Sequence, residues 1–116
     1  MKVLFAGLKP WENKYLEKKI AGARVPVEVE TMPEVAHKCR EENKDIEILG
    51  VFVDSKVGEN ELALFPRLRY IVALSTGYDN VDLNACKARG ISVSNVPSYG
   101  EDTVAEYTFA LMLDLS

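Results

Sequence analysis

Short apolar runs alternate with more polar, helix-like segments along the chain, and this alternation limits the folds that the chain can adopt. At least one end of each run carries a glycine, a proline or a charged residue, in or next to the run, as is common for strands. Strands and helices that alternate over short connections form a parallel sheet. The runs cover residues 2–7, 25–31, 46–54, 69–75 and 91–96.

The composition of the runs indicates where each strand lies in the sheet. The run 46–54 is almost continuously apolar, which is typical of a central strand covered on both faces. The run 25–31 alternates valine with polar residues and contains Pro26, which favours an edge strand. We therefore predict an α/β fold of flavodoxin-like type, with a five-stranded parallel sheet in the order 2-1-3-4-5 and helices on both faces.

The segments between the runs carry signals for helices. Pro10 suits a first helical position, and a second proline opens a charged helix with Val35, Ala36 and Cys39 as its buried stripe. The predicted helices cover residues 10–22, 33–44, 58–65 and 80–90, and a fifth begins near Asp102.

The end of the chain is apolar on nearly every side of a predicted helix. Thr103 and Glu106 have the spacing of a capping box, which predicts the helix start. A helix that is apolar all round needs more than one neighbour to bury it. We therefore expect the helix of residues 102–116 to continue beyond Ser116, or to pack against a second domain or a second copy of the chain.

Composition excludes several classes of function. The net charge of −4 over 116 residues does not favour nucleic acid or an anionic membrane as a partner. No apolar run reaches 18 residues, and the N-terminal run is too short for a signal peptide. Cys39 and Cys86 lie far apart, so we expect two reduced, buried cysteines in a cytoplasmic protein, and no metal site.

Three loops follow the last three predicted strands, at the edge where open α/β sheets bind ligands. They are DSKVG (54–58), STGYDN (75–80) and VPSYGED (96–102). If these strands are neighbours, the three loops line one edge of the sheet together.

The turn STGYDN can bind an anion or can simply connect a strand to a helix. Gly77 allows a close turn, and Asp79 or Asn80 can cap the following helix. Free amides near Thr76 and Gly77 would then face outward beside a helix N-terminus, which suits a carboxylate or a phosphate. The sequence leaves both interpretations open.

The other two loops offer weaker candidates. Tyr99 can contact a ligand or cover the start of the helix, and Lys56 can attract an anion or remain a solvated surface residue. His37, the only histidine, is predicted far from these loops and is not expected to be catalytic. The glycine spacing excludes both GxGxxG and a Walker A loop.

The ordered series TGYDN, VD, ARGI, NVP, YG and TVAE resembles the D-isomer-specific 2-hydroxyacid dehydrogenases, with the D-lactate dehydrogenase-like branch as the nearest match. The resemblance is specific over residues 67–116 and plausible back to Met1. It implies that residues 1–101 are a substrate-binding domain. It also implies that residues 102–116 start an interdomain and dimerisation helix, so a homodimer is expected through them.

The resemblance also implies site residues. The turn at Ser75, Thr76 and Gly77 would bind the carboxylate of a small 2-oxo or D-2-hydroxy acid through its amides. Tyr99 would border the substrate, and Ser55 and Lys56 would line the cleft. Thr76 and Thr103 would lie near NAD in the full-length enzyme.

The family's catalytic arginine, glutamate and histidine, and its Rossmann domain, would all follow Ser116. No catalytic residue is therefore expected within this chain, NAD is not expected to bind stably to it, and we expect it to be inactive alone. It would be an excised domain or a truncated product. The alternative is a stand-alone, non-catalytic flavodoxin-like binding or regulatory domain; a receiver domain is disfavoured, because no carboxylates follow the first strand.

Overall fold

The computed structural model describes residues 1–23, 28–32 and 41–115. Its strands and helices alternate along the chain, in agreement with the predicted α/β class. In chain order they are β1 (Lys2–Ala6), α1 (Pro10–Ala21), β2 (Glu28–Met32), a 3-10 helix (Glu41–Asp45), β3 (Ile48–Val51), α2 (Glu59–Ala63), β4 (Tyr70–Ala73), α3 (Leu83–Ala88), β5 (Ser92–Ser94) and α4 (Glu101–Leu115).

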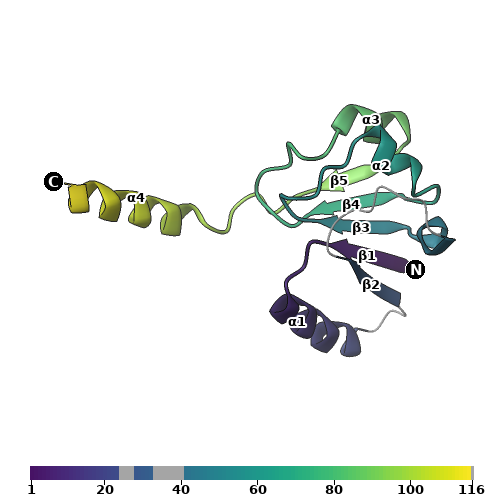
Figure 1. The fold of residues 1–116 in the computed structure, drawn as a ribbon, viewed down its shortest axis with the longest axis horizontal. Coiled ribbons are helices and arrows are strands. Elements are labelled where there is room, and N and C mark those ends of the chain that lie inside the picture. Colours follow the sequence, from purple (N-terminus) through teal and green to yellow (C-terminus); the bar gives the residue numbers. More distant parts are fainter. Residues whose placement is uncertain (24–27, 33–40, 116) are drawn as a thin grey trace.

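The strands form one parallel sheet in the order β2-β1-β3-β4-β5 (Figure 1). This is the order that the sequence predicts, with β2 at an edge and β3 in the centre. Because β3, β4 and β5 are neighbours, the loops that follow them emerge at the same edge of the sheet.

Apolar side chains of the strands and of α2 and α3 form one buried core. Leu49 and Ile71, from the two central strands, are completely buried. Phe5 and Gly50 are paired in register across β1 and β3, and a Cβ at Gly50 would collide with the Phe5 ring. The absence of a side chain at Gly50 therefore makes room for the Phe5 ring.

Helices α2 and α3 lie together near β5, while α1 lies near the opposite end of the sheet (Figure 1). Arg89, which follows α3, donates to the carbonyls of Leu62 and Phe65 at the end of α2 and so joins the two helices. The predicted helix over 33–44, with its stripe of Val35, Ala36 and Cys39, falls mostly outside the described residues. Whether helices cover both faces therefore stays a prediction.

Helix α4 extends away from the sheet (Figure 1). None of its side chains is buried, although most are apolar. The predicted capping box is wrong, because the helix begins at Glu101, two residues before Thr103. The first helical bond runs instead from the Val104 amide to the Gly100 carbonyl, over 2.9 Å.

Within the described part of the chain, no helix is both long enough and apolar enough to cross a membrane.

Candidate functional site

The turn after β4 is fixed from inside by Ser75. This side chain is only 3% exposed, and its hydroxyl donates to the Gly77 carbonyl over 2.7 Å. The Ser75 carbonyl accepts from the Val96 amide over 3.1 Å. Ser75 therefore anchors the turn and does not face solvent.

Thr76 and Gly77 form the exposed tip of the turn. Among the described residues, no group accepts a hydrogen bond from either backbone N–H. Exposed amides without a protein partner are free to bind an anion. A Cβ added at Gly77 would contact only the Asp79 carboxylate, at 3.4 Å, so the fold itself does not require glycine there.

The prediction that Asp79 or Asn80 caps the next helix, beside the turn amides, is wrong. Neither Asp79 nor Asn80 caps α3; the cap is Asp82, whose carboxylate accepts from the Ala85 amide over 2.9 Å. Helix α3 starts at Leu83, six residues after Gly77, so the helix does not begin at the turn itself. At the turn itself, the groups that could attract an anion are the backbone amides.

Asn80 joins the turn to the loop after β3. Its side-chain Nδ2 donates to the Phe52 carbonyl over 3.0 Å and to the Ser55 carbonyl over 2.8 Å. The Val57 amide donates to the Asn80 carbonyl over 2.8 Å. The Asp82 amide donates to the Val57 carbonyl over 2.9 Å, completing a parallel bridge between the two loops.

The two predicted residues of the loop after β3 face different ways. Ser55 is 2% exposed, whereas Lys56 is exposed. The Ser55 hydroxyl is buried without a partner among the described residues. The structure therefore presents Lys56 to solvent and keeps the Ser55 side chain inside the loop.

The loop after β5 approaches the turn from its other side. The Asn95 side chain donates to the Thr76 carbonyl over 2.8 Å. Beyond it, Tyr99 is 66% exposed. An open pocket of about 540 Å³ lies between this loop, the turn and α4, and its lining residues are Thr76, Tyr99, Gly100, Glu101, Val104 and Ala105. Thr76 and Tyr99 are thus brought together, while Thr103 is not among the lining residues.

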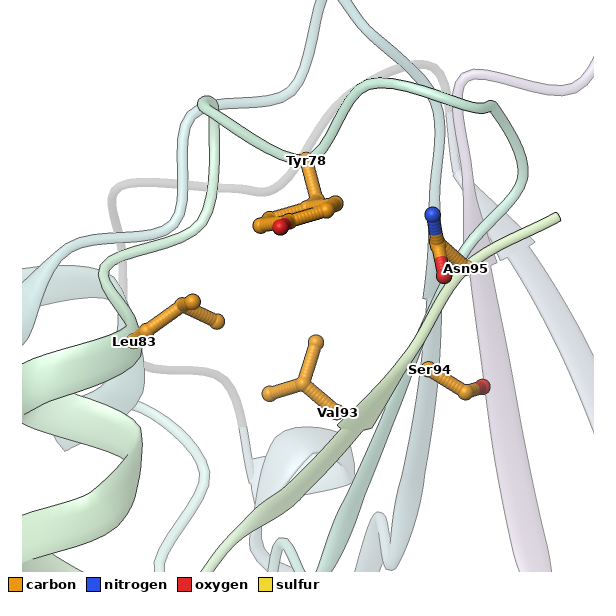
Figure 2. Close-up of a pocket in the computed structure, with 5 residues that line it drawn as sticks. All are labelled: Tyr78, Leu83, Val93, Ser94 and Asn95. Atoms are coloured by element: carbon orange, nitrogen blue, oxygen red, sulfur yellow. The ribbon is translucent and has the colours of Figure 1, made fainter. Parts of the chain in front are cut away.

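A second, smaller pocket of about 290 Å³ lies on the flank of the turn. Figure 2 shows the Tyr78 ring facing Leu83 and Val93 across the gap, with the Ser94 hydroxyl pointing away from it. Its walls are mostly apolar and offer no charged group. The candidate anion site is therefore the exposed tip at Thr76 and Gly77, not this pocket.

Sequence reasoning missed the two asparagines that hold the turn. Asn80 was considered only as a helix cap, and Asn95 was not singled out. Asn95 directly follows β5 and Asn80 lies in the loop after β4. Side-chain amides in such loops can bond to carbonyls of neighbouring loops. Among the described residues, no group of three or more His, Cys, Asp or Glu side chains could hold a metal ion.

Comparison with known proteins supports the resemblance seen in the sequence. Residues 3–111 match the family model for the D-isomer specific 2-hydroxyacid dehydrogenase, catalytic domain. A glyoxylate reductase of Pyrococcus furiosus is 33% identical over 76 residues, covering 66% of this chain and 23% of that protein. A 2-hydroxyacid dehydrogenase homolog of Haemophilus influenzae is 32% identical over 124 residues, covering 100% of this chain and 35% of that protein.

Solved structures show the same fold. A D-lactate dehydrogenase from Aquifex aeolicus, complexed with NAD and lactic acid, matches with a TM-score of 0.84 and 32% identity, covering 96% of this chain and 32% of that one. The apo D-lactate dehydrogenase from Escherichia coli matches with a TM-score of 0.79 and 27% identity, covering 99% and 37%.

The chain spans 23% and 35% of the length of the two curated relatives described above. The match to the family model nevertheless extends over almost the whole chain, including all three loops of the site. The chain therefore belongs to the D-isomer specific 2-hydroxyacid dehydrogenase family and corresponds to its catalytic-domain model.

Proposed function

We propose that these 116 residues are the substrate-binding part of an NAD-dependent oxidoreductase that interconverts a small 2-oxo acid and a D-2-hydroxy acid. The observation that carries the proposal is the pair of exposed amides at Thr76 and Gly77, which have no partner among the described residues. They lie at the carboxyl end of a parallel strand, where α/β sheets bind ligands. A carboxylate accepts well from two such amides, because charge-assisted hydrogen bonds are stronger than neutral ones.

Residues around the turn complete the proposed substrate site. Tyr99 lines the same pocket as Thr76 and would form its aromatic border. Lys56, exposed on the adjoining loop, would add positive charge for an anionic substrate. Ser75 would act through the backbone by holding the turn, and Ser55 would act in the same way inside its own loop.

NAD would serve the whole enzyme as the carrier that takes or gives a hydride at the second carbon of the acid. These 116 residues do not fit its pyrophosphate, because none of the spacings of the 7 glycines gives GxGxxG. Thr76 lines the pocket next to α4 and could reach the edge of the cofactor, but Thr103 does not line it. We therefore expect no stable NAD binding and no dehydrogenase activity from these residues alone.

Helix α4 would provide the contact between two copies of the chain in the proposed homodimer. Its large apolar side chains are exposed over much of its length, with Phe109 at 65% and Leu113 at 74%. A contiguous apolar surface of this kind marks a protein interface. In the whole enzyme, residues 101–115 would lie between the substrate-binding part, a separate NAD-binding domain and the second copy.

The proposal is tested by recording amide chemical shifts of the isotope-labelled chain during a titration with pyruvate. We expect the Thr76 and Gly77 amides to shift together and saturably. The Gly77→Ala protein should keep its stability, because the added methyl group meets only Asp79. It should bind pyruvate more weakly, since the added methyl group would crowd a carboxylate that approaches the two amides.

Methyl pyruvate is the matched control ligand, because it lacks the negative charge but keeps the oxo group. Equal shifts with both ligands would show that the turn does not recognise a carboxylate. Shifts confined to residues far from the turn would favour a binding domain for some other ligand. NADH-dependent reduction of pyruvate by the 116 residues would contradict the expected inactivity.

A further inference from the structure

Asn80 bonds to the residues on both sides of Lys56. The Ser55 carbonyl, just before Lys56, accepts from Asn80 Nδ2, and the Val57 amide, just after it, donates to the Asn80 carbonyl. Ser55 and Val57 are almost completely buried, at 2% and 0% exposure, while Lys56 between them is exposed. The backbone of Lys56 is therefore held at two points by one residue of the neighbouring loop.

The orientation of the Asn80 amide follows from its partners. Phe52 and Ser55 offer carbonyl oxygens, which can only accept, so the Nδ2 group must face them. The opposite atom, Oδ1, is buried without a partner among the described residues, as is the Ser55 hydroxyl. Burying an unpartnered acceptor is unfavourable. An apolar side chain would avoid that cost but could not join the two carbonyls.

We propose that Asn80 is a positioning residue that holds Lys56 in place beside the Thr76–Gly77 turn, so that the ammonium group and the turn amides act on the same carboxylate. The inference rests on the proposed function for its ligand. It goes beyond that function by assigning the coupling between the two loops to a residue that does not itself touch the substrate.

The coupling is tested with a double-mutant cycle on the 116-residue chain, with pyruvate as the probe ligand. Asn80→Ala and Lys56→Ala should each raise the dissociation constant about fivefold, as expected for one exposed charge interaction. Because Asn80 acts through Lys56, the double variant should be only about as weak as either single variant. Independent roles would multiply to about 25-fold by the same reasoning. Asn84→Ala, at an exposed position of α3, is the matched control and should bind normally.

Hydrogen exchange tests the connection between the loops without any ligand. In Asn80→Ala, the amides of Val57 and Asp82, which bridge the loops, should exchange faster, whereas the core amides of Leu49 and Ile71 should not change. A merely structural loss of stability would accelerate the slowest core amides as well. If Asn80→Ala does not fold, Asn80→Ser, which keeps one short donor, replaces it in both experiments.

The outcomes separate this inference from the proposed function. Absence of pyruvate binding in the unmodified chain would overturn both the proposed function and the shared-carboxylate role of Asn80. If the unmodified chain binds pyruvate, two results would overturn only the positioning role of Asn80. One is an Asn80→Ala dissociation constant equal to that of the unmodified chain. The other is a double variant whose loss of affinity is the product of the two single losses. Unchanged exchange at Val57 and Asp82 would overturn the coupling whatever the binding result.

Discussion

The strands of the sheet and α4 both consist mostly of apolar residues, but the two regions differ in whether those side chains are buried. In the sheet, Leu49 and Ile71 are completely buried by neighbouring strands and helices of the same chain. In α4, Phe109 and Leu113 remain 65% and 74% exposed. Apolar content therefore does not by itself form a core. A side chain is buried only where the fold places neighbouring strands or helices against it.

This difference separates a sheet with its own buried core from a helix, α4, that has no buried side chain. The sheet has its own core, and hydrogen bonds from Ser75 and Asn95 hold the turn at Thr76 and Gly77. The candidate substrate site can therefore be studied in this chain. In the proposed enzyme, a second copy and a second domain would cover the exposed apolar side chains of α4. The same principle operates at the turn, where the Thr76 and Gly77 amides have no partner among the described residues.

The largest expected effect is a loss of stability, and it is seen by comparing one leucine of the sheet with one leucine of α4. Leu49→Ala should reduce the free energy of unfolding by about 3 kcal/mol, because it leaves a cavity in a closed core. Leu113→Ala should change it by less than about 0.5 kcal/mol, because that side chain is exposed. Urea denaturation followed by fluorescence or circular dichroism measures both. Equal losses would mean that α4 is packed against the sheet in solution.

The next effect concerns association through α4. Sedimentation velocity should show that the chain self-associates, and Phe109→Glu should weaken this association by more than about tenfold, as expected for a central apolar contact. Trp11→Glu changes an equally exposed aromatic residue on α1 and should leave the association unchanged. A monomer at high concentration, or equal effects of the two substitutions, would contradict the proposed role of α4.

A smaller effect is expected from Asp79, whose carboxylate lies beside Gly77. Asp79→Asn should tighten pyruvate binding about threefold, because it removes a negative charge from an exposed anion site. The gain should shrink as salt concentration rises, since salt screens exposed charges. Calorimetry at two salt concentrations measures both changes. Weaker binding in this variant would mean that the turn does not hold an anion.

The smallest expected effect is the contribution of Cys86 to the pH dependence of stability. Burial raises the pKa of this thiol; the Asp82 carboxylate raises it further, and the Arg89 guanidinium opposes the shift. A raised pKa favours the neutral thiol in the folded state. Its stabilising contribution is therefore complete below the unfolded pKa, about 8.5, and is lost as pH rises through the folded value. The free energy of unfolding, measured from pH 7 upward, should fall more steeply with pH in the unmodified chain than in Cys86→Ala. Identical slopes would contradict this contribution.

The sequence predicts the architecture well because hydrophobic periodicity and chain order suffice for it. The run 46–54 is almost continuously apolar and contains the central strand β3, and the run 25–31, which alternates valine with polar residues, contains the start of the edge strand β2. Local signals failed where a competing contact determined the outcome. Thr103 and Glu106 match a capping box, yet α4 begins earlier, and Asp82 rather than Asp79 or Asn80 caps α3.

The site is harder to predict because its geometry depends on contacts between distant residues. Position after a strand identified the turn at Thr76 and Gly77 and the neighbouring Lys56. The bonds from Asn80 to Ser55 and from Asn95 to Thr76 span 25 and 19 residues, and no local pattern indicates them. Burial of the Ser55 side chain likewise depends on the folded loop.

A crystal structure of the chain with pyruvate tests the central claim most directly. We expect the carboxylate to lie within about 2.8–3.1 Å of the amide nitrogens of Thr76 and Gly77, with the Lys56 ammonium group on the same side. Pyruvate held elsewhere, or a turn whose two amides are bonded to protein carbonyls, would contradict it.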